Sequence, residues 1–108
     1  MIGIIMTDLN LKALIAIRDN PGITITEFSK FLWPDSDLWN VARKDGKGKG
    51  YKVIRNGQNY LGKLLKTGWI REVYTTNCIY RINRKFYLTD NGFAELNIAL
   101  KSMQQINM

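Results

Sequence analysis

The chain contains no histidine and a single cysteine among its 108 residues. Without histidine it lacks the most frequent general acid or base at neutral pH and the commonest metal ligand. The one thiol, Cys78, cannot form a disulfide within the chain, and alone it cannot build a structural zinc site. These absences argue against an enzyme, and we expect a binding protein that needs no metal ion and no other cofactor.

Long hydrophobic runs are also missing. The longest candidate, residues 1–6, is far shorter than the roughly 18–20 apolar residues that cross a bilayer, and it lacks the charged start of a signal peptide. We therefore expect no membrane partner and a cytoplasmic location. The length suits one domain over residues 1–108 with one hydrophobic core.

Acidic residues are scarce where basic residues are dense. The segment from Arg43 to Lys85 holds twelve of the sixteen Lys and Arg residues and only two acids, Asp45 and Glu72, for a net charge of +10. The remainder of the chain carries four bases and seven acids. This segregation favours a polyanion-binding face, whereas a lysine-rich surface kept for solubility is the plainer alternative.

Two amphipathic helices are expected before this basic segment. The first runs from Asp8 to Asp19, with Thr7 or Asp8 as its cap, and apolar residues on two sides suggest that a partner subunit covers one of them. The second opens with a capping box, Thr24 followed by Glu27, and ends near Trp33-Pro34, with Ile25, Phe28, Phe31 and Leu32 on its apolar side.

Residues 34–54 are read as a basic insertion rich in glycine and lysine. A loop of this length is usually either functional or disordered, so it is a mobile arm for the DNA backbone or a plain linker. Its glycines do not match a P-loop, which needs Gly-x-x-x-x-Gly-Lys-Ser/Thr between a strand and a helix.

The third helix is predicted from its cap Asn56 to Thr67, with Gly68 as the terminating glycine. On a helical wheel Tyr60, Leu61, Leu64 and Leu65 share one arc. The opposite arc contains no carboxylate. Its amides suit base edges and its cations suit phosphate or guanine; the residues are Gln58, Asn59, Gly62, Lys63 and Lys66, with Arg55 just before the helix.

Strand patterns follow Gly68. Residues 69–74 and 84–88 alternate as a hairpin, with residues 75–78 as its turn and 79–83 leading into the second strand. A last helix is expected from about Gly92 to Gln105 with an apolar stripe of Phe93, Leu96, Ala99, Leu100 and Met103. Together with the two-sided first helix, this stripe suggests a homodimer through the first and last helices.

Two segments, Tyr60-Leu61-Gly62-Lys63-Leu64-Leu65-Lys66-Thr67-Gly68-Trp69-Ile70 and Arg84-Lys85-Phe86-Tyr87-Leu88-Thr89-Asp90-Asn91-Gly92, carry a resemblance. They resemble the junctions of winged helix-turn-helix regulators of bacteria and phages, and the likeness covers roughly residues 8–100. It implies an α+β, mostly α fold: three helices, a two-stranded β wing and a C-terminal helix. The chain departs from that pattern in the long insertion between Trp33 and Asn56, where compact members have a short turn.

The resemblance implies sequence-specific binding of double-stranded DNA, transcription regulation and a place beside the nucleoid. The third helix would enter the major groove and the wing would touch the adjacent backbone or minor groove. The expected DNA-binding residues are Arg55, Asn56, Gln58, Asn59, Gly62, Lys63 and Lys66 on the third helix, Arg81, Arg84 and Lys85 on the wing, and Lys47, Lys49 and Lys52 in the insertion.

Two alternatives stay open at this point. A winged-helix scaffold can serve as a protein-interaction module, for which the aromatics Trp39, Tyr51 and Tyr74 are candidates. Aromatic stacking combined with the basic loop would instead suit RNA or single-stranded nucleic acid.

Overall fold

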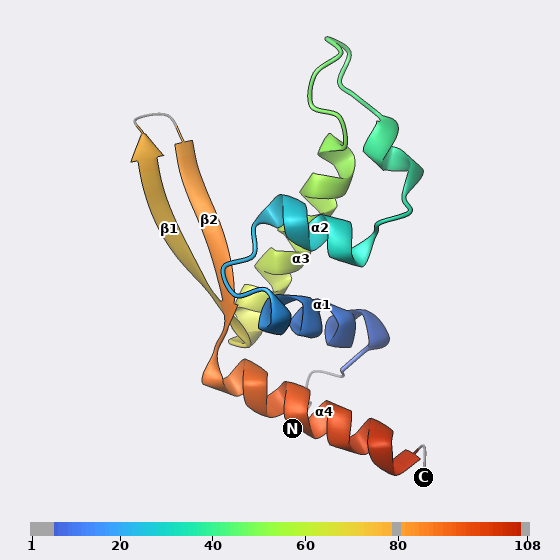
Figure 1. Cartoon of the computed structure of the whole chain (residues 1–108), viewed down its shortest axis with the longest axis vertical. Helices are drawn as coiled ribbons and strands as arrows, with labels where there is room; N and C mark the ends of the chain where they lie inside the picture. The colour runs from blue at the N-terminus through green and yellow to red at the C-terminus, as the bar shows by residue number, and fades with distance from the viewer. Residues whose placement is uncertain (1–5, 79–80, 107–108) are drawn as a thin grey trace.

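The computed structural model describes residues 6–78 and 81–106, with side chains described for 6–74 and 84–102. Helices α1, α2 and α3 lie together beside a two-stranded hairpin, and α4 runs along the end of the molecule next to α1 (Figure 1). The coarse prediction, an α+β fold that is mostly helical, is confirmed. In chain order the elements are α1 (Asp8–Asp19), α2 (Ile25–Leu32), the 3-10 helix η1 (Asp37–Asn40), α3 (Tyr51–Thr67), β1 (Ile70–Cys78), β2 (Arg81–Leu88) and α4 (Asp90–Ile106).

Helix α1 lies at the centre of the core. Leu14 and Ala13 are fully buried and Ile17 nearly so, because α1 packs against α2, α4 and β2 of its own chain. Much of both apolar sides of α1 is thus covered within the chain, although Leu9 is 36% exposed, and the partner subunit stays a prediction. The other buried hydrophobic residues come from every neighbouring helix and from the base of the hairpin; they include Phe28, Leu32, Leu61, Leu64, Ile70, Phe86 and Leu96.

Side-chain caps begin the first two helices as predicted. The Thr7 hydroxyl oxygen accepts a hydrogen bond from the Asn10 amide, and Thr24 and Glu27 form a reciprocal capping box. Both interactions satisfy backbone N–H groups that have no partner within the helix. The placement of Phe31 on the buried side of α2 is wrong, since 47% of this residue is exposed.

Helix α3 begins at Tyr51, five residues before the predicted cap Asn56. Its N-cap is Gly50, whose φ of 81° lies in the left-handed region, and a Cβ on Gly50 would lie 2.5 Å from the Trp39 ring. Val53 is buried and carries the apolar stripe of α3 back by two turns from Leu61. The predicted insertion is correspondingly shorter than residues 34–54.

Helices α2 and α3 are in close contact at Gly57. A Cβ built on Gly57 would lie 1.9 Å from the Ser29 hydroxyl oxygen and 3.1 Å from the Ser29 Cβ, so no larger residue fits there unchanged. The Ser29 hydroxyl donates to the Ile25 carbonyl at 2.9 Å and is fully buried. Nearby, the Tyr60 ring packs on Phe28 with centroids 6.2 Å apart. These contacts fix the rotation of α3 about its own axis.

The hairpin is longer than predicted. Strand β1 continues through residues 75–78: Thr75 pairs with Asn83, and pairing resumes at Cys78 after a shift in register, so the predicted turn at these residues is wrong. Threonine is β-branched and favours an extended backbone, which accounts for this continuation. At the base of the hairpin, the Phe86 amide donates to the Ile23 carbonyl at 3.1 Å and joins the sheet to the α1–α2 turn.

Helix α4 starts at Asp90, two residues before the predicted start at Gly92. Thr89 precedes it, and its hydroxyl accepts a hydrogen bond from the Gly92 amide at 3.1 Å. Leu96 is fully buried, but Phe93 is 44% exposed, so the predicted stripe is only partly covered. The side chain of Met103 lies outside the described part. No helix in the described part combines the length and hydrophobicity that crossing a membrane requires.

We predict that Gly57→Ala destabilises the protein by about 1–3 kcal/mol, because the added methyl group overpacks the α2–α3 contact. Gly62→Ala is the matched control in the same helix: apart from the helix's own nearby backbone and the two adjoining residues, no described residue lies within 4 Å of its Cβ position, so it should stabilise by about 0.5–1 kcal/mol. Thermal unfolding of both variants measures the two effects. Equal unfolding temperatures would contradict the close contact.

Candidate nucleic-acid interface

One face of α3 is turned to solvent, and it is the predicted polar face. Leu61 and Leu64 point into the core, while Gln58, Asn59, Lys63 and Lys66 are exposed on the opposite side. Gly62 lies among them, and no side chain described for residues 6–74 or 84–102 comes within 4 Å of its Cβ position, its two chain neighbours aside. Arg55 and Asn56 are exposed one turn earlier. The face is not covered by the protein's own atoms, and α3 contributes no carboxylate to it.

This face continues into a cleft formed with the hairpin, which we call the α3–β2 cleft. Its volume is about 510 Å³. Five of the predicted DNA-binding residues of α3 meet one of the predicted wing residues in it: the lining residues are Gln58, Asn59, Gly62, Lys63, Lys66 and Arg84. Residues far apart in the sequence are thus brought together around one concave surface that carries amides and cations.

A second hollow, the loop hollow, lies at the start of α3. It has a volume of about 350 Å³ and shares Gln58 with the α3–β2 cleft; its other lining residues are Arg43, Gly48, Lys49, Tyr51, Ile54 and Arg55. The Tyr51 ring centroid lies 5.5 Å from the Arg43 guanidinium carbon and 6.0 Å from that of Arg55. Tyr51 and Arg43 were not among the predicted DNA-binding residues, because the segment was interpreted as an irregular loop.

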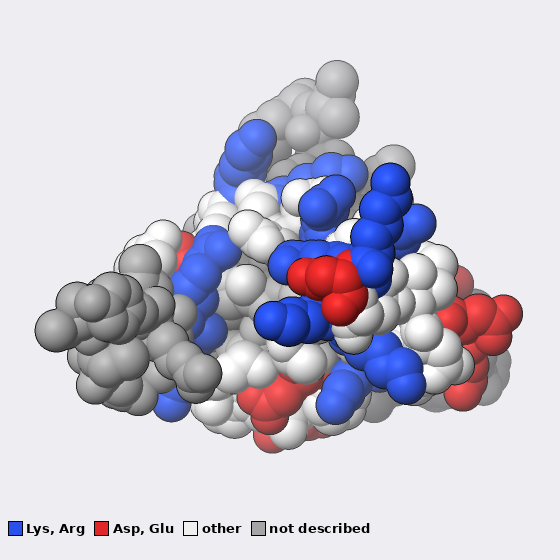
Figure 2. Space-filling model, turned by 90° about the horizontal axis from the view of Figure 1, so that it is seen from above, with Lys and Arg blue, Asp and Glu red and all other residues white. Residues whose placement is uncertain are grey.

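The glycine- and lysine-rich loop folds back on itself. The Arg43 amide donates to the Lys47 carbonyl at 2.8 Å, and the Gly50 amide donates to the Val41 carbonyl at 3.0 Å. Lys47 and Lys49 are exposed on this loop and Lys52 on the first turn of α3, but of these three only Lys49 lines the loop hollow. Seen from this end, Lys and Arg side chains gather over the middle of the molecule, and most acidic side chains lie toward its margins (Figure 2).

The predicted wing residues do not share one face of the hairpin. Arg84 lies on the same face of β2 as the buried Phe86 and lines the α3–β2 cleft. Lys85 lies on the other face, where its Cδ is 3.7 Å from a Cβ built on Gly22. Arg71 stacks over the Tyr87 ring at 4.6 Å, and the strand register places both on the face of Lys85. Arg81 belongs to β2, but its side chain lies outside the described part.

Glu72 is the one acid that strand pairing brings to this region. Its carboxylate pairs with the Arg84 guanidinium, and its side chain is only 10% exposed. Burial raises the pKa of Glu72, but the hydrogen bonds from Arg84 and Tyr74 and the positive charge of Arg84 outweigh burial and leave the pKa below its ordinary value. The carboxylate is therefore ionised at neutral pH, and Arg84 keeps a partner of opposite charge.

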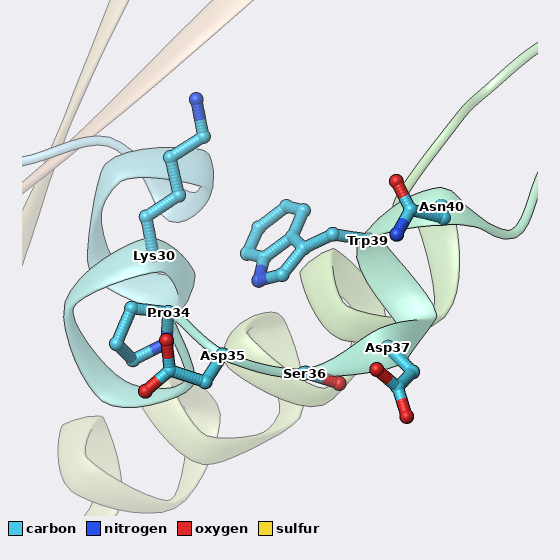
Figure 3. Close-up of a pocket in the computed structure, with 7 residues that line it drawn as sticks. All are labelled: Lys30, Pro34, Asp35, Ser36, Asp37, Trp39 and Asn40. Carbon is cyan, nitrogen blue, oxygen red and sulfur yellow. The ribbon is translucent and has the colours of Figure 1, made fainter.

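A third hollow, of about 540 Å³, lies apart from this face between α2 and η1. The Trp39 indole extends toward Lys30 above Asp35 and Ser36, and its Nε1 donates to the Trp33 carbonyl (Figure 3). One Lys and two Asp line this hollow, so its charge does not favour a polyanion. Nowhere in the described part do three Cys, Asp or Glu side chains gather to hold a metal ion.

Comparison of the chain with protein-family models, with curated proteins and with solved structures finds no match.

We predict that the Glu72–Arg84 pair contributes a pH-dependent part of the stability. Because the pKa of Glu72 is lowered in the folded state, its contribution is present above the unfolded pKa near 4.5 and is lost as the pH falls through the folded value. Below pH 4.5 the unfolding free energy of the wild type should fall more steeply than that of Glu72→Gln. Denaturant unfolding between pH 3 and pH 7 compares them, and parallel curves would contradict the pairing.

Proposed function

We propose that this chain binds double-stranded DNA as a winged helix-turn-helix protein and regulates transcription. One observation carries the proposal: the exposed, acid-free face of α3 lines a cleft with Arg84 of the hairpin. The order of the elements also supports it, since α3 follows α2 and leads directly into a two-stranded hairpin. In this proposal α3 is the recognition helix and the β1–β2 hairpin is the wing.

The dimensions of α3 suit a major groove. Arg55 and Lys66 are eleven residues apart, which corresponds to roughly 17 Å along a helix axis. A major groove is about 12 Å wide, so cations at the two ends of this face reach phosphates on both sides while the middle of the face meets the base edges. Gln58 and Asn59 lie in that middle, and their amides can pair bidentately with adenine. The open surface at Gly62 allows the helix backbone to come close to the bases.

The wing and the loop add contacts to the DNA backbone. Arg84 lines the α3–β2 cleft beside the outward face of α3. The loop hollow, with Lys49 and Arg43, lies at the start of the same helix. Lys47 and Lys52 add attraction that does not depend on sequence. Lys85 would reach the DNA only from the outer face of the wing.

The alternatives lack an equally specific observation. Tyr74 is 61% exposed and available to a protein partner, but Trp39 and Tyr51 are half-buried by their own chain. Single-strand binding uses exposed aromatic rings as stacking platforms, whereas the centre of the α3 face consists of amides, lysines and a glycine. We further propose that the chain acts by binding alone and requires no cofactor, because it has no histidine and one thiol.

The test measures binding of random duplex DNA, single-stranded DNA and RNA at several salt concentrations. With six to eight phosphate contacts, the log-affinity against log-salt slope for duplex should be roughly −5 to −7. Lys63→Ala and Lys66→Ala should each reduce its magnitude by about one unit, because each removes one phosphate contact.

Lys101→Ala is the matched control, since Lys101 is exposed on α4, away from this face. It should leave the slope close to that of the wild type. Stronger binding to RNA or to a single strand would favour those ligands, and no binding to any nucleic acid would favour the protein-interaction module.

A homodimer through α1 and α4 stays a prediction. Ile98 is 60% exposed on α4, beside a shallow hollow that Leu11 of α1 also lines. Burying such apolar surface favours association. Sedimentation at micromolar concentration should show a species of twice the 12.5 kDa chain mass. A single species of 12.5 kDa would contradict the dimer.

A further inference from the structure

Arg84 is held in place from several sides. Its Nε donates to the Glu72 carboxylate, its guanidinium carbon lies 5.6 Å from the centroid of Phe86, and the Tyr74 ring lies 6.0 Å away. Phe86 is fully buried and Glu72 is 10% exposed, so both contacts belong to the rigid base of the hairpin. A long, flexible side chain is thereby restricted before any ligand arrives.

The restraint leaves the outer edge of the guanidinium available. Nε of Arg84 donates to Glu72 and the Arg84 side chain also hydrogen-bonds Tyr74, but a guanidinium has five N–H donors and this side chain is still 28% exposed. Arg84 lines the α3–β2 cleft together with Lys63 and Lys66. The two terminal nitrogens of a guanidinium form a planar fork that matches two oxygens of a phosphate.

We propose that Glu72 is a positioning residue for DNA binding. It holds Arg84 so that the two terminal nitrogens bind the two non-bridging oxygens of one backbone phosphate seated in the α3–β2 cleft. This inference rests on the proposed function and extends it with a second residue and a defined ligand group. It assigns a favourable role to an acid that is paired with a cation of the cleft.

Charge alone predicts the opposite effect of removing Glu72. The carboxylate repels a phosphate, so a variant without it should bind DNA more tightly if only net charge mattered. If Glu72 positions Arg84, removing Glu72 leaves the guanidinium mobile. Binding must then order the Arg84 side chain, and this entropy cost lowers the affinity for DNA. The direction of the change in affinity therefore distinguishes the two roles.

The experiment measures the affinity of the full chain for random duplex DNA at one fixed low salt concentration. Glu72→Ala should weaken binding about three- to tenfold, because Arg84 is no longer held. Glu72→Gln changes the charge equally but keeps an oxygen that accepts from Nε, so it should weaken binding less than Glu72→Ala. Arg84→Lys keeps the positive charge but loses the fork and should weaken binding about as much as Glu72→Ala.

Glu95→Ala is the charge-matched control, because Glu95 is exposed on α4. It should bind as tightly as the wild type or slightly more tightly. Circular dichroism and thermal unfolding identify any variant that fails to fold; if Glu72→Ala does not fold, Glu72→Gln and Arg84→Lys decide the question.

Two results would overturn the positioning role: equal tightening by both Glu72 variants, or wild-type affinity of Arg84→Lys. In that case the proposed function still stands if Lys63→Ala reduces the magnitude of the log-affinity against log-salt slope by about one unit relative to the wild type. If the wild-type chain does not bind duplex DNA at low salt, both proposals are overturned.

Discussion

The contact between Gly57 of α3 and Ser29 of α2 determines how α3 lies on the rest of the molecule. A glycine at this point lets the two helices approach until the space for a Cβ is filled by the serine side chain. Successive helical residues are about 100° apart, so fixing one of them toward α2 fixes the direction of all the others. Val53, Leu61 and Leu64 then enter the core, and the polar residues of α3 face solvent. The cleft, its charge and the proposed role of Arg84 all depend on this rotation.

The cations on the two sides of the α3–β2 cleft have different surroundings. Along α3 the cations are exposed and without acids, which leaves their charge available to a polyanion. On the hairpin Arg84 is paired with Glu72, and its guanidinium lies over the buried Phe86 ring. The first arrangement supplies long-range attraction, and the second supplies a fixed direction. A groove-binding surface uses both, because attraction alone does not set the register of a protein on its ligand.

Much of the helical part of the fold could be predicted from the sequence. Thr7 and the Thr24–Glu27 box marked the starts of α1 and α2 correctly, and Gly68 marked the end of α3, since caps are local chemistry that a few residues encode. The polar face of α3 was also predicted correctly. It depends only on the helical period and not on where the helix starts.

Features that depend on contacts between distant residues were not predicted. Asn56 looks like a helix start in the sequence, but it lies inside α3, where the neighbouring Gly57 is needed for the approach of Ser29. The run from Thr75 to Cys78 looks like a turn, yet strand pairing extends through it. The opposite placement of Arg84 and Lys85 follows from the register, and the loop hollow at Tyr51 follows from the folding back of residues 41–50.

The central claim is that the outward face of α3 is the surface that meets DNA. The most direct measurement is a titration of the isotopically labelled protein with a short random duplex at low salt, followed by the amide chemical shifts of each residue. The account predicts that the largest changes fall between Gln58 and Lys66 and around Arg84, with α4 little affected. Changes centred on α4, or no changes at all, would contradict it.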